Sequence, residues 1–340
     1  MPFSNVDWSE LLQQHMSRIA VTDGMAPESV AMLEESGHEV MVQHYSPEEL
    51  ANGVLSGFDA VVVRSATKMT AEAINASCSE GGSLSFIGRA GVGVDNIDLE
   101  AASKNGVVVC NTPGASTKSV VELTIGHLLA STRFIPKADR TLRRSEWAKK
   151  SLRGTELGGK RLGLIGYGRI AQGVGALAQS FGMEIHAFDP YVSKKLASEL
   201  GCILHNDVNE LFVECAHISV HCNLSEETRH LVNLERISMM PGIGADGTAC
   251  GNHIVNCARG GIIDERAALE ALESGKLTSV ALDVFEVEPA IDNPLLDNEG
   301  FHGSPHIGAA TLEAQSRVGE EMVNNLLAHF DGEKPASSLN

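Results

Sequence analysis

The sequence has few aromatic residues, no paired cysteine motif and no apolar run long enough to cross a bilayer. Phe, Trp and Tyr together make up 4% of the 340 residues. The seven cysteines form no C-x-x-C pair, and their odd number favours reduced thiols in a cytoplasm-like compartment. The first residues, MPFSNVDWSELLQQ, lack the basic start and the apolar stretch of a signal peptide. Together these absences predict a cytoplasmic protein with no membrane partner.

Positive charge is also scarce. The chain has 26 Lys and Arg against 44 Asp and Glu, which gives a formal net charge of −18. This balance argues against nucleic acid or an anionic membrane surface as a partner, and an anionic substrate would need a local basic cluster. The contents of hydrophobic residues, 43%, and charged residues, 21%, are ordinary for a globular protein. The length favours two domains over one.

One stretch, Arg161 to Pro190, has the order strand, glycine turn, helix, strand. An apolar strand at Arg161–Ile165 runs into Gly166-Tyr-Gly168-Arg-Ile-Ala171, which fits the pattern G-x-G-x-x-G/A. In this pattern Gly166 allows the tight turn, and Gly168 lets the backbone approach a pyrophosphate. Ala171 is small enough for the helix to pack on the strand. The stretch therefore predicts a dinucleotide site.

The end of this stretch indicates which dinucleotide binds. The N–H groups of Arg169 and Ile170 begin the helix, where an anionic pyrophosphate would lie. The next strand ends in Asp189, eighteen residues after Ala171, where an acid accepts hydrogen bonds from the ribose hydroxyls of adenosine. A carboxylate there repels a 2′-phosphate, and Pro190 and Tyr191 follow it instead of an arginine. We therefore expect NAD rather than NADP.

The rest of the chain predicts two α/β domains built on parallel sheets. Before the glycine turn, short apolar strands alternate with helices, but no second glycine fingerprint is present. A breaker cluster at Asn111–Gly114 indicates a hinge, and a final helix at about Thr311–His329 is expected to return to the first domain. We expect a doubly wound substrate-binding domain at 1–112 and 309–340, with a doubly wound, NAD-binding Rossmann domain at 113–308 inserted into it.

Three other segments carry structural expectations. Residues 1–17 look like a polar leader. Ser119 to about Trp147 is predicted to be one long helical stretch. Gly242–Asn252 is a glycine-rich polar insert, which we expect to be a surface loop.

Three clusters beyond the glycine turn carry groups suited to chemistry on a hydroxy acid. Arg259 follows an apolar strand, and its planar fork suits a carboxylate and the adjacent keto oxygen, although a surface arginine is the alternative. The acids of Leu282–Pro289 could orient a histidine or form a solvated turn. His306, in a rigid turn between Pro and Gly, suits the task of taking a hydroxyl proton as hydride leaves carbon. We expect no metal, because the glycine and proline between His302 and His306 keep the two off one helix.

With these motifs the sequence resembles the NAD-dependent D-2-hydroxyacid dehydrogenases over nearly the whole chain from residue 18. Further motifs that carry the resemblance are Val63–Lys68, Gly88–Asp98, Asn111–Gly114 and Gly154–Leu157. The resemblance implies a Rossmann domain inserted into a flavodoxin-like substrate-binding domain. Within the family, the sequence is most similar to the branch that oxidises 3-phosphoglycerate to 3-phosphohydroxypyruvate, at the entry to serine synthesis.

The resemblance also implies roles for individual residues. Arg259 would bind and polarise the substrate, Glu288 would pair with His306, and His306 would be the general acid/base. Asp283 would contact the nicotinamide carboxamide. The residues expected at the cofactor are Val92, Gly166, Gly168, Arg169, Ile170, Asp189, Cys222, Cys257, Ala258, Asp283, Gly308 and Ala309.

The substrate would be held by residues from elsewhere in the chain. The backbone at Val92 and Gly93 would hold its carboxylate. Arg64 would reach a phosphate, with Arg89 as a helper. By the resemblance, Lys149 and Lys150 would complete this site from the partner subunit of a homodimer or of a dimer-based tetramer. From the residues alone, Arg64, Lys68 and Arg89 form a basic group in an acidic protein, as a phosphorylated acid requires.

The sequence departs from the family pattern in three places. His221-Cys222-Asn223 stands where a His-Thr-Pro-like segment is usual, which removes a hydroxyl contact to the cofactor. The insert Gly242–Asn252 is longer than usual. The chain ends at Asn340, soon after the return helix, so we expect neither the serine-sensing domain of some relatives nor serine feedback of that type.

Two other functions fit the same sequence. A glyoxylate or hydroxypyruvate reductase would use the same scaffold, although many of these enzymes prefer NADP and they do not need the Arg64 contact. An NAD-sensing corepressor that binds peptides would keep Arg259, Glu288 and His306, and would have an exposed apolar groove on the first domain.

Overall fold

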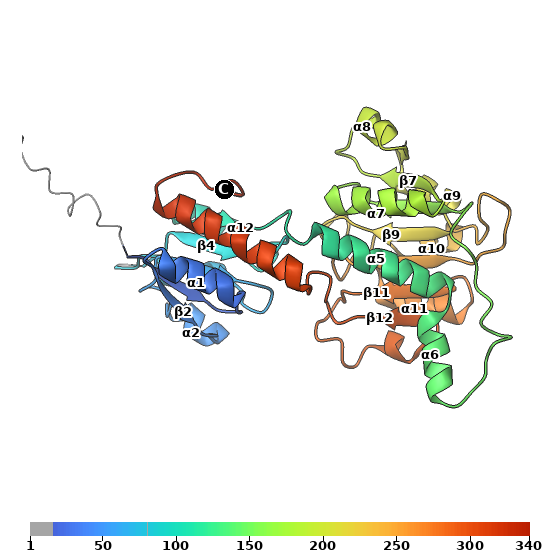
Figure 1. Ribbon diagram of the computed structural model, residues 1–340, viewed down its shortest axis with the longest axis horizontal. Helices are drawn as coiled ribbons and strands as arrows, with labels where there is room; N and C mark the ends of the chain where they lie inside the picture. The colour runs from blue at the N-terminus through green and yellow to red at the C-terminus, as the bar shows by residue number, and fades with distance from the viewer. Residues whose placement is uncertain (1–15, 80) are drawn as a thin grey trace, which may run out of the picture. The chain divides into compact units, whose positions relative to one another are not determined.

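The computed structural model describes residues 16–79 and 81–340, which divide into two units (Figure 1). The first unit comprises the described residues up to Ser116 together with Leu312–Asn340, and the second comprises Thr117–Thr311. The polar leader predicted at residues 1–17 lies, except for its last two residues, outside the described residues. The chain therefore leaves the first unit once and returns to it.

The first unit is built on a five-stranded parallel sheet in the order β2-β1-β3-β4-β5. Its strands are β1 (Arg18–Val21), β2 (Glu39–Val42), β3 (Ala60–Val63), β4 (Phe86–Arg89) and β5 (Val108–Cys110). Successive side chains of a strand point to opposite faces of the sheet. Ile19 and Val21 of β1 accordingly lie in one apolar layer, and Ala20 lies in the other. Both faces are buried, as is usual for a parallel sheet.

Helices cover both faces of this sheet. They are α1 (Pro27–Glu35), α2 (Pro47–Ala51), α3 (Ala71–Ser77), α4 (Leu99–Lys104) and α12 (Leu312–Phe330). Leu33 of α1 and Met322 of α12 lie in the same apolar layer as Ile19, and Figure 1 shows the two helices side by side. Gly88 of β4 lies under α12, where a Cβ atom would collide with the Met322 sulfur. The last helix of the chain therefore completes the core of the first unit.

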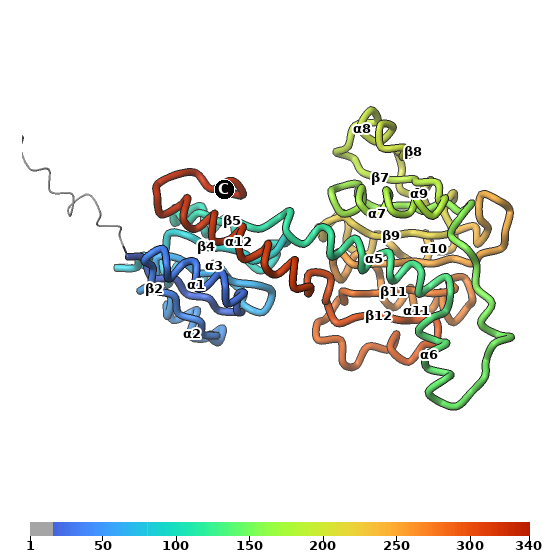
Figure 2. The backbone as a smooth tube through the Cα atoms, in the orientation of Figure 1, coloured from blue at the N-terminus to red at the C-terminus, as the bar shows by residue number. Residues whose placement is uncertain are grey.

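The second unit is built on a seven-stranded parallel sheet in the order β12-β11-β10-β9-β6-β7-β8 (Figure 2). Its strands are β6 (Arg161–Ile165), β7 (Glu184–Phe188), β8 (Cys202–His205), β9 (His217–Val220), β10 (His253–Asn256), β11 (Ser279–Leu282) and β12 (Phe301–Gly303). Its helices are α5 (Thr117–Thr132), α6 (Ile135–Arg143), α7 (Arg169–Ser180), α8 (Lys194–Glu199), α9 (Val208–Glu214), α10 (Leu234–Met239), α11 (Glu265–Glu273) and the 3-10 helix η1 (Pro294–Asp297). Apolar residues of α5 and α7 fill the layer on one face, and those of α9, α10 and α11 fill the other. The predicted fold class, two doubly wound parallel sheets, is confirmed.

The long helical stretch predicted from Ser119 to Trp147 is wrong. The structure has two helices there, α5 and α6, and the second ends at Arg143. Between them Phe134 adopts a left-handed conformation, with φ of 54°, and Pro136 stands in the first turn of α6. A left-handed residue cannot continue a right-handed helix, and proline is tolerated only where a new helix begins. The chain therefore turns at Phe134.

The insert Gly242–Asn252 is fastened to the amino end of β6. Asp246 accepts a hydrogen bond from Lys160 Nζ at 2.9 Å, and its backbone N–H donates to the Gly159 carbonyl at 3.0 Å. Lys160 also donates to the Gly158 carbonyl, and its side chain is only 5% exposed. The glycine turn lies at the carboxyl end of β6, so the insert supports the sheet at the amino ends of its strands, away from that turn.

We expect Asp246→Asn to lower the melting temperature, because the buried Lys160 ammonium loses its counter-ion. The hydrogen bond from Lys160, with one from the Thr248 N–H, lowers the pKa of Asp246 from 3.8 to about 2. A lowered carboxyl pKa stabilises the fold above pH 3.8 and ceases to do so as the pH falls towards 2. Thermal unfolding should therefore show a difference from wild type at pH 7 that shrinks on acidification. The control is Asp292→Asn, at an exposed carboxylate of the same unit; an equal effect of both changes would contradict the assignment.

Candidate functional site

The candidate site of the second unit lies where the strand order reverses. From β6 the chain builds β7 and β8 on one side, then crosses to β9 on the other. Parallel sheets bind ligands at such a switch point, outside the carboxyl ends of the strands. Gly166 follows β6 with φ of 85°, and a Cβ atom there would lie 2.9 Å from the Cys222 nitrogen after β9. Only glycine fits this turn, as the motif predicted, and Cys222 stands beside it.

The amino end of α7 opens onto free space. A Cβ atom on Gly168, the residue that caps α7, would meet no heavy atom within 4 Å. In the described part of the chain, the backbone N–H groups of Arg169 and Ile170 donate to no protein acceptor. Ala171 is fully buried beneath them. Open backbone, unused N–H groups and the positive end of the helix dipole together fit an anionic pyrophosphate.

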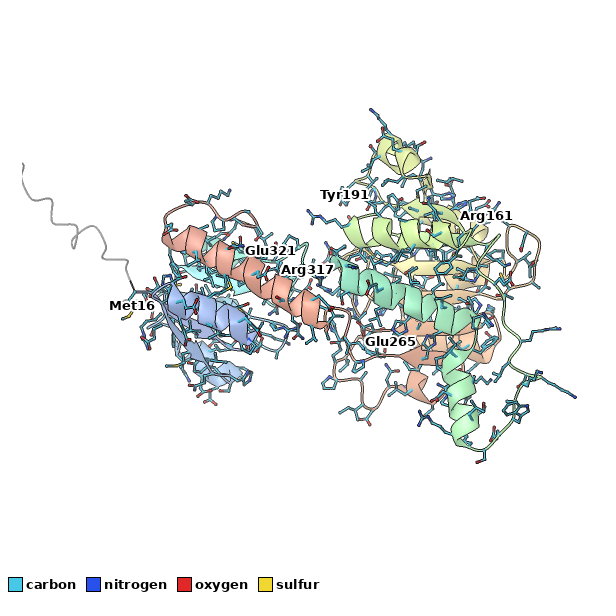
Figure 3. The ribbon with its side chains drawn as sticks, in the orientation of Figure 1. Met16, Arg161, Tyr191, Glu265, Arg317 and Glu321 are labelled. Atoms are coloured by element: carbon cyan, nitrogen blue, oxygen red, sulfur yellow. The ribbon has the colours of Figure 1, made fainter. Side chains whose placement is uncertain are left out.

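Asp189 ties the end of β7 to the glycine turn. One of its carboxylate oxygens accepts a hydrogen bond from the Tyr167 N–H at 2.8 Å, and the other accepts one from the Tyr191 N–H at 2.8 Å. A carboxylate has about four acceptor positions, so about two remain for ribose hydroxyls. In Figure 3, Tyr191 marks this end of the strands and Arg161 marks the opposite, amino end of β6.

His306 is paired with Glu288 at the carboxyl edge of the same sheet. His306 Nδ1 lies 2.8 Å from Glu288 Oε2, and Glu288 Oε1 accepts the Phe285 N–H at 3.0 Å. Burial raises the pKa of Glu288, but these two hydrogen bonds and the charges of His306 and Arg259 outweigh it and lower the pKa below its ordinary value. The carboxylate is thus ionised and can only accept, so His306 carries a proton on Nδ1 and leaves Nε2 for a ligand.

Arg259 is carried by a turn that Asn256 holds at the end of β10. The Asn256 side chain donates to the Arg259 carbonyl at 2.8 Å and accepts the Ala258 N–H at 2.9 Å. The guanidinium donates to the Ala258 carbonyl at 2.7 Å. Cys257 lies in the core, and burial raises the pKa of its thiol to about 12, so only its backbone can meet a cofactor.

Asp283, predicted to meet the nicotinamide, holds the turn that carries His306. Its side chain is fully buried, with the residue 1% exposed. Oδ1 accepts the Ile307 N–H at 2.8 Å and the Ser304 hydroxyl at 2.6 Å, and Oδ2 accepts the Gly308 N–H at 2.8 Å. About one acceptor position is left for a cofactor. Ala309 follows this turn and is half-buried.

The first unit gathers the predicted substrate residues at the carboxyl ends of β3 and β4. Val63 pairs with Arg89 in the sheet, so Arg64 and Arg89 stand at neighbouring strand ends. Asp23 accepts the Arg64 N–H at 2.7 Å, and Asn96 donates to the Arg64 carbonyl at 2.7 Å. Arg89 Nη2 donates to the Ser65 hydroxyl at 3.0 Å. The backbone of Arg64 is therefore fixed from both sides.

A turn after β4 presents two backbone N–H groups. Asn111 donates to the Val92 carbonyl at 2.6 Å, and the Thr112 N–H donates to the Gly91 carbonyl at 2.9 Å. Within residues 16–79 and 81–340, the N–H groups of Val92 and Gly93 have no acceptor. Successive free N–H groups in a turn suit an anion such as a carboxylate.

Lys149 and Lys150 lie in the segment between α6 and β6, and both are exposed. The described residues contain no group of three or more His, Cys, Asp or Glu side chains that could hold a metal ion. Their helices also include none long and apolar enough to span a membrane.

Comparison with known proteins gives consistent matches. Residues 125–308 match the family model for the NAD binding domain of D-isomer specific 2-hydroxyacid dehydrogenases. The chain is 44% identical to D-3-phosphoglycerate dehydrogenase of Methanocaldococcus jannaschii over 96% of its own length, but it spans only 60% of that relative. It is 44% identical to hydroxypyruvate reductase of Thermotoga maritima over 91% of its length and 97% of the relative. The solved D-lactate dehydrogenase of Aquifex aeolicus with NAD and lactic acid is 26% identical, with a TM-score of 0.79 over 93% of this chain and 96% of that one.

Substituting the two glycines of the turn by alanine should weaken NADH binding in both cases but lower the melting temperature in only one. Gly166→Ala puts a Cβ atom into the Cys222 backbone at a positive φ, so we expect a lower melting temperature and loss of NADH binding. Gly168→Ala meets no protein atom, so the melting temperature should stay while the Kd for NADH, measured by fluorescence titration, rises. Equal NADH affinity of Gly168→Ala and wild type would show that no ligand approaches this backbone.

Proposed function

The chain belongs to the D-isomer specific 2-hydroxyacid dehydrogenase family, and we propose that it acts as an NAD-dependent D-3-phosphoglycerate dehydrogenase. The reaction would convert 3-phosphoglycerate to 3-phosphohydroxypyruvate. The observation that carries the choice of substrate is the pair Arg64 and Arg89, fixed at adjacent strand ends in a strongly acidic chain. The name of the M. jannaschii relative supports it.

NAD fits the switch point of the second unit. The N–H groups of Arg169 and Ile170 beside the bare Gly168 backbone would hold its pyrophosphate, and Asp189 would hold its adenosine ribose. Bound there, NAD would supply the acceptor for the hydride that leaves the substrate carbon. Cys222, Gly308 and Ala309 would border it, as would the backbone of Cys257 and Ala258.

The substrate's proton would go to His306. The hydroxyl O–H bond breaks as the C–H bond gives up its hydride, and His306 Nε2 takes the proton. Glu288, already hydrogen-bonded to Nδ1, stabilises the imidazolium that results. Arg259, whose charge acts on Glu288, would bind the substrate carboxylate and the developing keto oxygen. The N–H groups of Val92 and Gly93 would hold the same carboxylate, and Arg64, helped by Arg89, would hold the phosphate.

A second candidate function follows from the T. maritima relative. Its sequence identity to this chain, 44%, is the same as that of the M. jannaschii relative, and the match covers 97% of its length. A hydroxypyruvate or glyoxylate reductase would need the same NAD site and the same three residues Arg259, Glu288 and His306, but no phosphate contact. The two functions therefore differ at Arg64. A corepressor would bind NADH and turn over neither kind of acid.

We also propose a homodimer, or a tetramer built from such dimers. The segment around α6 exposes large apolar side chains, with Ile135 55%, Leu142 58% and Trp147 82% exposed. A partner subunit would cover them and bring its Lys149 and Lys150 to the substrate. Sedimentation velocity would contradict this proposal if the wild type sedimented as a monomer and Trp147→Ser had the same sedimentation coefficient.

The seven cysteines, all free thiols, fit a cytoplasmic location, which cell fractionation would test.

The proposed choice of substrate can be tested by measuring NADH oxidation with 3-phosphohydroxypyruvate, hydroxypyruvate and glyoxylate in turn. We expect the phosphorylated acid to have the highest kcat/KM. Arg64→Ala should lower kcat/KM for it by roughly 10- to 100-fold, the worth of a charge-assisted hydrogen bond, and change glyoxylate little. Lys104→Ala removes one positive charge from α4 of the same unit and should leave both values unchanged. Equal losses on both substrates with Arg64→Ala would favour the reductase.

The acid/base role of His306 is tested by His306→Ala. Turnover should fall by roughly 10²- to 10⁴-fold, because the hydroxyl proton loses its acceptor, while NADH still binds. His230→Ala is a matched control: His230 also has a positive φ, of 51°, and pairs with a carboxylate, that of Glu286 at 3.1 Å. If both variants lose the same activity, His306 has no special role.

A further inference from the structure

A chain of hydrogen bonds runs beneath the His306 turn and reaches α5. The Ser304 hydroxyl lies 2.6 Å from Asp283 Oδ1 and 3.0 Å from His127 Nε2. His127 is buried in α5, and Ser304 directly follows β12, the edge strand of the sheet. The hydrogen bond of the His306 ring goes to Glu288, and the three residues His127, Asp283 and Ser304 come from separate parts of the chain. The chain therefore links the core of the second unit to the turn that presents His306.

The direction of each hydrogen bond follows from proton counting. The Ser304 hydroxyl donates its single proton to Asp283 Oδ1. The Ser304 oxygen must then accept from His127, which fixes the His127 proton on Nε2. Burial lowers the pKa of His127 more than the charge of Asp283 raises it, which agrees with a neutral imidazole. His127 thus acts as a donor of fixed tautomer.

The backbone turn at His306, which these hydrogen bonds reach, has a conformation that other contacts must stabilise. His306 has φ of 53°, a left-handed conformation that is sterically unfavourable for a non-glycine residue. Its N–H donates to the Asp283 carbonyl at 2.8 Å, and the next two N–H groups, of Ile307 and Gly308, donate to the Asp283 carboxylate. Such a conformation persists only where its surroundings over-determine it. The orientation of one carboxylate therefore determines the backbone at His306.

We propose that Ser304 and His127 are positioning residues for His306. Ser304 fixes the rotamer of the Asp283 carboxylate, and His127 fixes the hydroxyl of Ser304. The carboxylate then holds the turn at the angle at which His306 Nε2 meets the substrate oxygen. A misplacement of the base by a fraction of an ångström slows proton transfer without changing ground-state binding. The inference rests on the proposed role of His306 as the base.

The experiment compares removal of each hydrogen bond with a conservative replacement. Ser304→Ala and His127→Leu should each lower kcat roughly three- to tenfold, the rate equivalent of one neutral hydrogen bond, while KM and the Kd for NADH stay within about twofold. Ser304→Thr keeps the hydroxyl and His127→Gln keeps an N–H donor, so both should recover most of kcat. Ser131→Ala is the control, because it removes another buried hydroxyl of α5 that has no partner among the described residues.

A second measurement does not depend on the substrate. Hydrogen exchange of the Ile307 and Gly308 amides, followed by NMR or mass spectrometry, should be faster in Ser304→Ala and His127→Leu than in wild type and Ser131→Ala. If the wild type turns over no hydroxy acid, the proposed function fails, and unchanged exchange in these variants would overturn the positioning role as well. In an active enzyme, an unchanged kcat would overturn the proposal. An equal loss of kcat in His127→Leu, His127→Gln and Ser131→Ala would also overturn the proposal, because a change in packing would then explain the loss.

Discussion

The candidate site depends on one geometric constraint, the close approach of the chain after β6 to the chain after β9. These neighbouring strands are where the sheet reverses its order, and parallel sheets bind ligands at such a point, outside the carboxyl ends of the strands. Gly166 lies against the Cys222 backbone and has a positive φ, so no other residue closes the turn. That turn leads into the open amino end of α7 and brings the Tyr167 N–H to Asp189. The parallel connectivity then delivers Arg259, Glu288 and His306 to the same edge of the sheet.

The chain faces an electrostatic difficulty, because a protein of net charge −18 is proposed to bind two anions. It meets the difficulty locally, with backbone N–H groups as much as with side chains. The α7 amino end and the Val92–Gly93 turn offer N–H groups that carry no compensating acid. Asp189 is likewise met by backbone groups, since two N–H groups donate to its carboxylate and about two acceptor positions remain. Short-range hydrogen bonding therefore outweighs the long-range field, which salt screens within about 10 Å.

The sequence could predict whatever is encoded locally. The turn at Gly166 and the acid at Asp189 follow from spacing within one βαβ unit, and the two parallel sheets follow from the repeated alternation of strands and helices. The break at Phe134 could have been predicted from Pro136, but the apolar positions that indicate a helix, Val120, Leu123 and Leu128, all precede it. In α7, Ile170, Val174 and Leu177 recur at helical spacing, yet Leu177 is exposed, and the helix approaches Val121 through Gly173. Apolar spacing identifies a helix but not which neighbour it will meet.

What the sequence could not predict is contact between distant positions. His127, Asp283 and Ser304 share no motif, and only the order of β11 and β12 beside α5 brings them together. The same holds for Lys160 and Asp246, 86 residues apart, whose ion pair gives the insert its place.

Two independent hydrogen-bond systems meet at His306, and they control different properties of it. Glu288 acts on the ring and determines which nitrogen carries the proton. Asp283 acts on the backbone and determines where the ring stands. A carboxylate that did both would have to move when the ring changed charge, because a new cation draws its partner closer. Dividing the tasks lets Glu288 respond to the proton while Asp283, which accepts hydrogen bonds from three uncharged donors, stays in place. Preorganisation of this kind requires a buried and a half-exposed acid at the same edge of the sheet, which is the arrangement found here.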